Sequence, residues 1–257
     1  MLTRAWYSKG PFATSANNAY AQLPFPGIKT DAGRADAEDL VRSTLGTGAP
    51  IAPATPAFAA AHEKFVQSVV SSATDVPIIY MSTNTFIPFD AADPTFRPPG
   101  RHYAVALLLS HPLSRGSVHI TDTDAGTASG VAVDPHFLEH PQDAEVLARG
   151  LRFVEQQLVR AEPLASHLQE IPARFGDVES NKDYVRRTAS GANHWVGSCA
   201  MMPREMGGVV DAKLRVHGCA NLRVCDASVV PLVPRGNTQA VVYGVAEMAA
   251  KIIKESY

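Results

Sequence analysis

The fold of this chain is decided by two stretches near its end, GANHWVGSCAMMPREMGG at residues 191–208 and CDASVVPLVPRGNTQAVVYGVAEMAAKII at residues 225–253. They place an imidazole, His194, and a carboxamide, Asn237, where one secondary-structure element gives way to another. Both side chains lie among small and apolar residues, where a polar group persists only if it has partners or a chemical task. His194 and Asn237 are therefore the candidate site.

An apolar stripe at helical spacing predicts a helix from Thr238 to Lys254, and Asn237 is its natural N-cap. The first amides of such a helix are unpaired and partly positive, which suits an anion or an electron-rich ring edge. Before it, Leu222–Asp226 is typical of a short strand that ends in a carboxylate, a layout that faces cofactors in α/β folds. Each residue alone also has an ordinary interpretation: a helix cap, a turn aspartate, and a half-buried histidine beside Trp195.

Composition favours an ordinary soluble globular protein. The chain has 257 residues, 46% of them hydrophobic, and 23 basic against 25 acidic side chains. The basic residues form no stripe of the kind that nucleic-acid binding needs. No apolar run approaches the roughly 20 residues that span a bilayer, and no signal-peptide pattern opens the chain, so a cytoplasmic location is slightly favoured.

The three cysteines, Cys199, Cys219 and Cys225, lack the spacing of a metal site or a redox pair. An odd count without a glycosylation sequon fits a reducing compartment. Buried free cysteine behaves as a small hydrophobic residue, so we expect all three to pack in the interior. The histidines outside His194 are scattered, and we expect no metal site.

Upstream, the sequence predicts alternating helices and strands. Thr55 caps a helix that runs to about Ala73, with a buried stripe through Phe58, Ala61, Phe65 and Val69. Asp143 caps another helix to about Arg160, and a short helix covers Lys182–Thr188. The stretch from Ile28 to Pro53 shows no clear periodicity, so we expect a surface excursion there.

Three strands are predicted in the same region. Val76–Met81 is the first, and Tyr103–Ser110 is an almost unbroken apolar run that predicts a strand covered on both faces. A turn at His111–Gly116 then leads to Ser117–Thr121, whose alternation is that of an antiparallel partner.

A series of short motifs follows in fixed order through the second half of the chain. With this order and spacing, the chain resembles the C-terminal part of the glucose-methanol-choline (GMC) family of flavin oxidoreductases; a weaker likeness covers residues 10–24. The motifs that carry the resemblance are Pro112–Val118, Val133–Pro135, Phe137-Leu138, His140-Pro141, Asp143, Asn193–Ser198, Met202–Glu205, Gly208–Asp211, Leu214–Gly218, Asn221–Val224, Asp226–Ser228, Pro231 and Asn237–Gln239.

The resemblance implies an α+β fold, with a mainly antiparallel sheet flanked by helices and a C-terminal segment that would complete an FAD-binding, Rossmann-like domain. Residues 1–100 would be a partial substrate-binding region, and residues 101–257 the family's C-terminal region. No G-x-G-x-x-G turn opens a helix anywhere in the sequence. We therefore expect the N-terminal FAD domain to be absent.

The same resemblance implies FAD-dependent oxidation of an alcohol to a carbonyl compound. His194 would accept the hydroxyl proton while hydride passes to the flavin N5, and Asn237 would complete the pair. Cofactor contacts would come from Asp226, Ala227, Trp195, Thr238 and Gln239. The Ser-Arg-Gly turn of the family joins two strands of the substrate-domain sheet, so Arg115 is expected to be structural.

Partner and pathway follow from the same comparison. We expect an N-terminal FAD-domain polypeptide or self-association to accompany the chain, a small alcohol as substrate, and a role in secondary metabolism. Helix Thr238–Lys254 would then leave its apolar stripe partly uncovered. Two alternatives stay open: a truncated, non-catalytic remnant or partner subunit, and a lyase or cyclase without net redox change.

Overall fold

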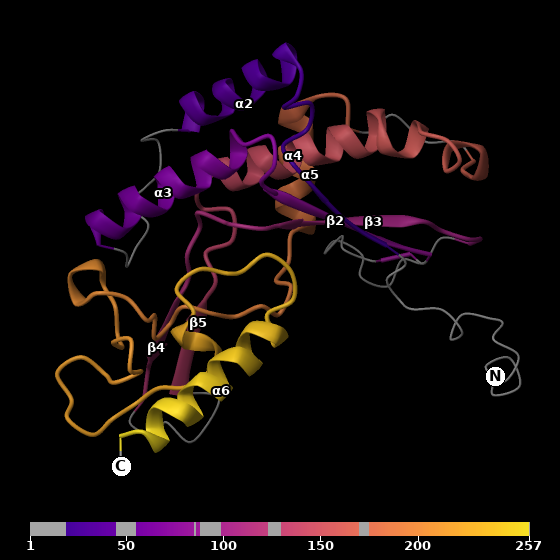
Figure 1. Cartoon of the computed structure of the whole chain (residues 1–257). Coiled ribbons are helices and arrows are strands. Elements are labelled where there is room, and N and C mark those ends of the chain that lie inside the picture. The colour runs from indigo at the N-terminus through magenta and orange to yellow at the C-terminus, as the bar shows by residue number, and fades with distance from the viewer. Residues whose placement is uncertain are drawn as a thin grey trace, which may run out of the picture. The chain divides into compact units, whose positions relative to one another are not determined.

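The computed structural model describes residues 19–44, 55–84, 86–87, 99–122, 130–169 and 175–256 (Figure 1). Their regular elements are helices and small antiparallel sheets, which confirms the predicted α+β class. The chain forms two compact units. The first combines Met1–Ala37, Ser72–Leu109 and Ala144–Ser190, and the second Glu38–Ser71, Ser110–Asp143 and Gly191–Tyr257. The predicted division at residue 100 stays a prediction.

The first unit contains a three-stranded antiparallel sheet in the order β1 (Ala19–Leu23), β2 (Ile78–Thr83), β3 (Ala104–Leu109). β2, in the centre, is almost wholly buried, whereas every residue of β3 is only half-buried. The expectation that Tyr103–Ser110 is covered on both faces is therefore wrong. β3 is an edge strand, and its apolar composition resembles that of a central strand because one face still meets the core.

Helix α4 (Pro141–Gln156) lies across this sheet (Figure 1). Gly150 permits the close approach: a Cβ there would lie 2.6 Å from Leu107 Cδ2 and 2.7 Å from Ile78 Cδ1. Further along the helix, the Phe153 ring packs against Tyr80 with centroids 5.5 Å apart. The core of the first unit thus lies between β2, β3 and one face of α4.

Helix α2 (Asp31–Thr44) occupies the stretch that we expected to be a surface excursion, so that expectation is wrong. Ala37 and Leu40, at 1% and 0% exposed, are its buried apolar side chains. This helix is largely charged, and its two buried apolar residues lie three positions apart. That periodic signal is too weak to predict a helix. The neighbouring residues 45–54, which include the rest of that stretch, lie outside the described residues.

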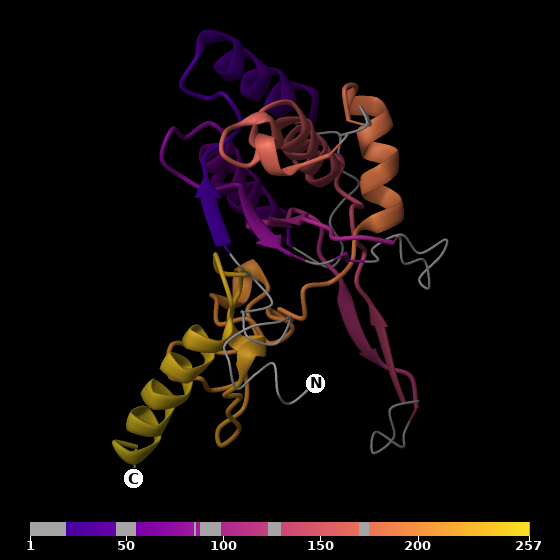
Figure 2. The same cartoon turned by 90° about the vertical axis from the view of Figure 1, so that its right-hand side faces the viewer.

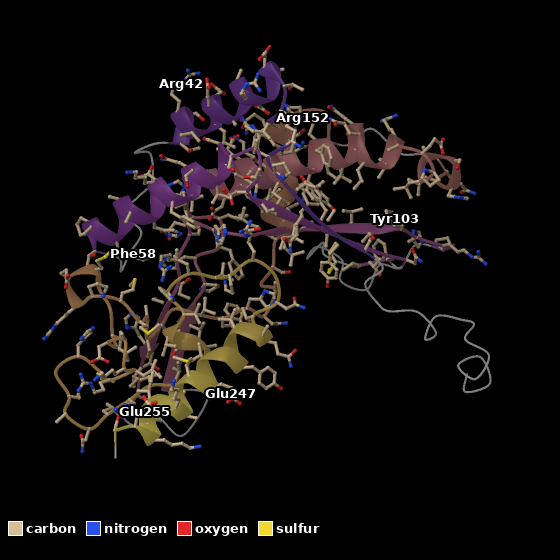
Figure 3. The ribbon with its side chains drawn as sticks, viewed as in Figure 1. Arg42, Phe58, Tyr103, Arg152, Glu247 and Glu255 are labelled. Carbon is tan, nitrogen blue, oxygen red and sulfur yellow. The ribbon has the colours of Figure 1, made fainter. Side chains whose placement is uncertain are left out.

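A chain of ion pairs joins α4 to Asp36 and to helix α5 (Val178–Thr188). Arg149 Nε lies 2.9 Å from Asp36 Oδ1, and Arg152, labelled in Figure 3, reaches Asp36 Oδ2 at 2.8 Å. Arg149 also pairs with Glu145, whose other oxygen lies 2.5 Å from Lys182 Nζ. Since Arg149 is 6% exposed, this network neutralises a buried charge.

Helix α5 begins one turn before the predicted start at Lys182. Asp177 caps it, because its carboxylate accepts a hydrogen bond from Ser180 N at 2.9 Å. Asn181, fully buried, donates to Ala148 O at 3.2 Å and to Phe175 O at 3.0 Å. These contacts hold the helix to α4 at a position where the sequence shows only a polar residue.

In the second unit, helix α3 (Pro56–Val70) begins as predicted, with Phe58 N donating to Thr55 Oγ1 at 3.3 Å. Its buried face differs from the predicted stripe: Phe65 is 40% exposed and packs edge-on against His111, 5.0 Å between centroids. The buried residues of the helix are Phe58, His62, Val66, Val69 and Val70.

Strand β4 (Ser117–Ile120) pairs with β5 (Val131–Asp134) in a separate two-stranded antiparallel ribbon. The predicted pairing of Ser117–Thr121 with Tyr103–Ser110, across the Ser-Arg-Gly turn, is therefore wrong. Leu113, which is buried, and Ser114 redirect the connection, because their amides donate to the two oxygens of Asp143, each at 2.8 Å. Asp143 lies inside the first turn of α4, so it holds this loop and is not the predicted N-cap.

The C-terminal part of the second unit consists of turns, two 3-10 helices, η4 (Arg204–Met206) and η5 (Ala227–Val229), and helix α6 (Gln239–Lys254) (Figure 2). The predicted strand Leu222–Asp226 is wrong: within residues 175–256 this stretch contributes only an isolated bridge between Arg215 and Arg223. A small core of Val210, Leu214, Val229 and Ala249 holds α6 to these turns.

Among the described residues, no helix has the length and apolarity that crossing a bilayer requires. The described residues also contain no cluster of three or more His, Cys, Asp or Glu side chains able to hold a metal ion. Cys199 is half-buried, but Cys219 and Cys225 are exposed, so the prediction that all three cysteines pack in the interior is wrong for these two.

Candidate functional site

The segment that follows His194 is hydrogen-bonded to the turn that follows Asp226. Gly197 N and Cys199 N both donate to Ser228 O, at 3.1 and 3.0 Å, and Met201 N donates to Val229 O at 2.8 Å. These bonds bring together two segments that lie about thirty positions apart in the sequence. They place His194 three residues before the first anchored amide.

His194 itself lies on an irregular loop and is half-buried. The residue before it, Asn193, has a φ of 57°, a left-handed conformation that asparagine tolerates better than most side chains. Among the described residues, the His194 imidazole has no hydrogen-bond partner. Its ring nitrogens are therefore available to a group from outside the described chain.

Asn237 lies on the loop that enters α6, and its side chain is exposed. The predicted N-cap is displaced by one residue, since α6 starts at Gln239 and Thr238 occupies the N-cap with no side-chain capping bond. Asn237 likewise has no hydrogen-bond partner among the described residues. The carboxamide and the first amides of α6 are thus left open to a ligand.

Asp226 and Ala227 lie at the start of η5. Asp226 Oδ1 accepts a hydrogen bond from Ser228 N at 2.8 Å, and the carboxylate caps the short helix while remaining exposed. This is the turn role that any aspartate can take. Only one carboxylate oxygen takes part in the bond, so a contact with a cofactor remains geometrically open and stays a prediction.

Trp195 forms a surface aromatic pair with Phe137, with ring centroids 6.3 Å apart and ring planes inclined by 20°. Trp195 is 58% exposed and Phe137 48%. Gly191 packs beside both rings, because a Cβ there would lie 3.0 Å from Trp195 and 3.2 Å from Phe137. Phe137 belongs to a motif of the family resemblance, but nothing in the sequence predicts that it stacks beside the residue following His194.

Two further features of the second unit, at Arg115 and His62, were not predicted from the sequence. Arg115 donates from Nη1 to Pro231 O at 3.2 Å and thereby reaches the segment that leads to Asn237. His62, on α3, is 3% exposed and has both ring nitrogens without partners among the described residues. Burial lowers the pKa of His62 to about 4, because the charged imidazolium is poorly solvated there. The Ser-Arg-Gly motif marks Arg115 only as a turn residue, and His62 has no sequence signal, because the contacts of both depend on segments distant in the chain.

All seven residues predicted for the site belong to the second unit. Described hydrogen bonds join the His194 segment to the Asp226 turn, and none joins Asn237 to either of them. The site combines a half-buried imidazole without a partner, an exposed carboxamide, an exposed indole and an uncapped helix start. These groups can bind the acceptor oxygens of an aromatic ligand and take a proton from a second molecule. The predicted roles of the seven residues remain predictions.

Comparison with known proteins shows which family the chain is similar to. The family model described as GMC oxidoreductase, C-terminal region, matches residues 112–246. The GMC oxidoreductase family protein Mala s 12 of Malassezia sympodialis is 36% identical over 153 residues, which cover 58% of this chain and 24% of that protein. The chain thus spans about a quarter of the length of the curated relatives it matches.

Solved structures share the fold. A new fungal aryl-alcohol oxidase superposes with a TM-score of 0.72 at 23% identity, over 96% of this chain and 40% of that one. An FAD-dependent oxidoreductase from Chaetomium thermophilum gives a TM-score of 0.77 at 18% identity, over 99% of this chain and 42% of that one. Since the family model matches more than half of the sequence, the chain belongs to the GMC oxidoreductase family.

Proposed function

We propose that this chain carries the proton-accepting site of an FAD-dependent alcohol oxidation, with His194 as the base. The observation that supports this most strongly is the His194 imidazole, half-buried, without a partner among the described residues, and three residues from a hydrogen-bonded anchor at Gly197. A base needs a free nitrogen, which the imidazole has, and an anchored backbone, which begins three residues on at Gly197. Membership of an oxidoreductase family gives the class of reaction.

The residues present suit FAD as the cofactor. Thr238 leaves the start of α6 without a side-chain cap, so the amides of the first turn can donate to the electron-poor ring's carbonyl edge. Gln239 is exposed beside them, and Trp195 offers an exposed aromatic face. Asp226 and Ala227 would contact the chain that links the ring to the adenosine part. FAD, when bound, supplies the hydride acceptor.

The residues of the chain then handle the proton and the substrate oxygen. The alcohol hydroxyl donates a hydrogen bond to His194 Nε2, which takes the proton as the carbinol carbon loses hydride. Asn237, exposed on the loop that enters α6, would donate from its carboxamide to the same oxygen and orient it. A single positioned base of this kind contributes about 10²–10⁴ in rate. The substrate loses one proton and one hydride and becomes a carbonyl compound, so the atoms and charges of the reaction balance.

The cofactor site needs a further polypeptide region. The chain spans about a quarter of its curated relatives, so we infer that an FAD-binding polypeptide region completes the cofactor site. Self-association is the second arrangement that we propose. A small alcohol is the proposed substrate, in line with the aryl-alcohol oxidase among the similar structures, and secondary metabolism the proposed context.

The test is the rate of flavin reduction by a primary aryl alcohol in the flavin-loaded assembly of this chain with the family's FAD-binding region. We expect His194→Ala to lower the first-order reduction rate about 10²–10⁴-fold, as the loss of a general base does. His119→Ala, on an exposed strand position of the same unit, is the matched control and should leave the rate unchanged. Reduction at the wild-type rate in His194→Ala would refute the proposal.

A further inference from the structure

Arg115 contacts three separate segments of the second unit. Its Nη1 donates to Pro231 O at 3.2 Å, and its guanidinium carbon lies 4.9 Å from the centre of the Phe58 ring on α3 (Figure 3 labels Phe58). No carboxylate among the described residues forms an ion pair with it. Buried cations are usually paired with an opposite charge, whereas this one is held only by a carbonyl and a ring face. Such an arrangement indicates a specific structural or functional role.

The third contact is with Gly197. A Cβ at this position would lie 3.1 Å from Arg115 Nη2, 3.4 Å from Pro231 O and 3.5 Å from Val230 O. The guanidinium therefore lies against the backbone between the segment that carries His194 and the segment that leads to Asn237. Gly197 also has a φ of 92°, so a side chain there would be strained by the backbone conformation and crowded by the guanidinium.

The loop that contains Arg115 does not need this side chain for its own shape. The amides of Leu113 and Ser114 are already held by the buried carboxylate of Asp143, each at 2.8 Å. The Arg115 guanidinium makes its contacts with other segments. Phe58 lies 57 positions away in the sequence, and Pro231 lies 116 positions away. A residue that only formed the Ser-Arg-Gly turn would make its bonds within the turn.

We propose that Arg115 is a positioning residue, which holds the His194 segment against the Pro231 segment and thereby fixes where the imidazole stands. Holding the two segments together involves this chain alone, whereas the effect of Arg115 on catalysis rests on the proposed function. The Nη1 bond holds Pro231, the Nη2 edge supports Gly197, and the ring of Phe58 backs the guanidinium. Arg115 touches neither reacting atom, so it acts through His194 and is not itself catalytic.

Amide hydrogen exchange on the full chain tests whether Arg115 holds the two segments together. The reporter amides are Gly197, Cys199 and Met201, which pair with Ser228 and Val229. We expect Arg115→Met to accelerate their exchange by about 10- to 100-fold, the effect of losing one hydrogen bond to a charged group. Exchange at Val216 and Val224, whose amides donate to Leu222 O and Leu214 O outside this segment, should not change.

The matched control is Arg223→Met. Arg223 also donates from Nε to a backbone carbonyl, Lys213 O at 3.2 Å, but lies away from the reporter amides. This variant should leave exchange at residues 197–201 unaltered. Arg115→Lys keeps the charge and one donor, so it should restore part of the protection that Arg115→Met loses.

A second readout uses Trp195. The sequence has two tryptophans, so Trp6→Phe leaves Trp195 as the only one. In that background, Arg115→Met should raise the acrylamide quenching constant of Trp195, because its loop loosens. If Arg115→Met unfolds the chain, Arg115→Gln decides: acceleration confined to residues 197–201 supports the proposal, and uniform or absent acceleration overturns it.

The two proposals fail separately. If His194→Ala leaves flavin reduction intact while Arg115→Met still frees the reporter amides, the catalytic assignment falls and the positioning role stands. If His194→Ala abolishes reduction but exchange at residues 197–201 is the same in Arg115→Met, Arg115→Gln and wild type, the positioning role falls alone. In the loaded assembly, a true positioning defect should lower kcat more than it raises KM and should recover partly in Arg115→Lys.

Discussion

His62 is a buried imidazole on α3 with no hydrogen-bond partner among the described residues. Burial is the main reason that its pKa falls to about 4, and the nearby cation Arg115 with His111 and His140 adds to the shift. In the unfolded chain the pKa returns to about 6.5. Between these two values the unfolded state binds more protons, so stability falls as pH falls from about 6.5 to about 4.

We therefore expect His62→Leu to remove this part of the pH dependence. The group contributes about 3 kcal/mol of lost unfolding free energy across that window, from 1.36 kcal/mol per pKa unit. Urea unfolding of wild type and variant between pH 4 and pH 7 measures it, with exposed His119→Leu as the control. Stability curves of wild type and His62→Leu that run parallel throughout this range would contradict a lowered pKa of His62 in the fold.

Asp143 is the second buried ionisable group at this scale. Burial raises its pKa, and the amides of Leu113 and Ser114 that it accepts oppose that rise. Asp143→Ala leaves two backbone donors without an acceptor, so we expect a loss of about 2–5 kcal/mol in unfolding free energy. Thermal and urea unfolding check the value. Asp183→Ala removes an exposed carboxylate from α5 as the control, and an equal effect in both variants would contradict this role.

At the scale of secondary-structure elements, the ion pairs around Arg149 are expected to contribute to the unfolding free energy of the first unit. Arg149→Met leaves Asp36 and Glu145 with one cation fewer in a largely buried setting, and we expect a cost of about 3–5 kcal/mol. Arg186→Met, which breaks an exposed pair with Asp183 on α5, should cost about 0–1 kcal/mol. Equilibrium unfolding compares the two, and similar costs would mean that the network adds nothing beyond a surface pair.

Local signals predicted the elements better than their partners. The Thr55 cap and Pro56 correctly start α3, and the apolar runs correctly mark β2 and β3. Strand pairing failed, because β4 was assigned to β3 by adjacency in the chain while its partner is β5. Alternation fixes which face of a strand is apolar, but it does not say which strand lies beside it.

For the candidate site too, individual residues were predicted better than the contacts between them. Family motifs singled out His194, Asn237 and Asp226, and the structure places all three on loops or turns of one unit. The sequence did not predict the hydrogen bonds from Gly197 to Ser228 or from Arg115 to Pro231. Such contacts join segments 31 and 116 positions apart, and one sequence holds no record of which distant segments meet.

At the scale of the whole molecule, apolar surface is left uncovered. Val118, Ile120, Val131 and Val133 face one side of the β4–β5 ribbon and are 37% to 72% exposed. On α6, Tyr243 and Met248 are 67% and 57% exposed, while the predicted stripe through Val245 and Ala249 is at least half-buried. Two-stranded ribbons are marginal alone, so this surface is expected to be covered in the working assembly.

We expect the isolated chain to associate at micromolar concentration through this ribbon. Sedimentation velocity should show weight-average mass rising with concentration, and Ile120→Lys should weaken the association at least tenfold, because a charge would be buried in the contact. Lys64→Glu on α3, away from the ribbon, serves as a charge-changing control. A wild-type chain that stays monomeric over the whole concentration range would exclude self-association through this face.

The measurement closest to the proposed site is the emission of Trp195, in a Trp6→Phe background, as FAD is loaded into the assembly of this chain with the family's FAD-binding region. If the loop of His194 faces the flavin, the visible flavin bands should co-elute with the chain and Trp195 emission should fall as they appear. The fall should be absent with the flavin-free assembly. Full flavin loading with unchanged Trp195 emission would contradict a cofactor beside His194.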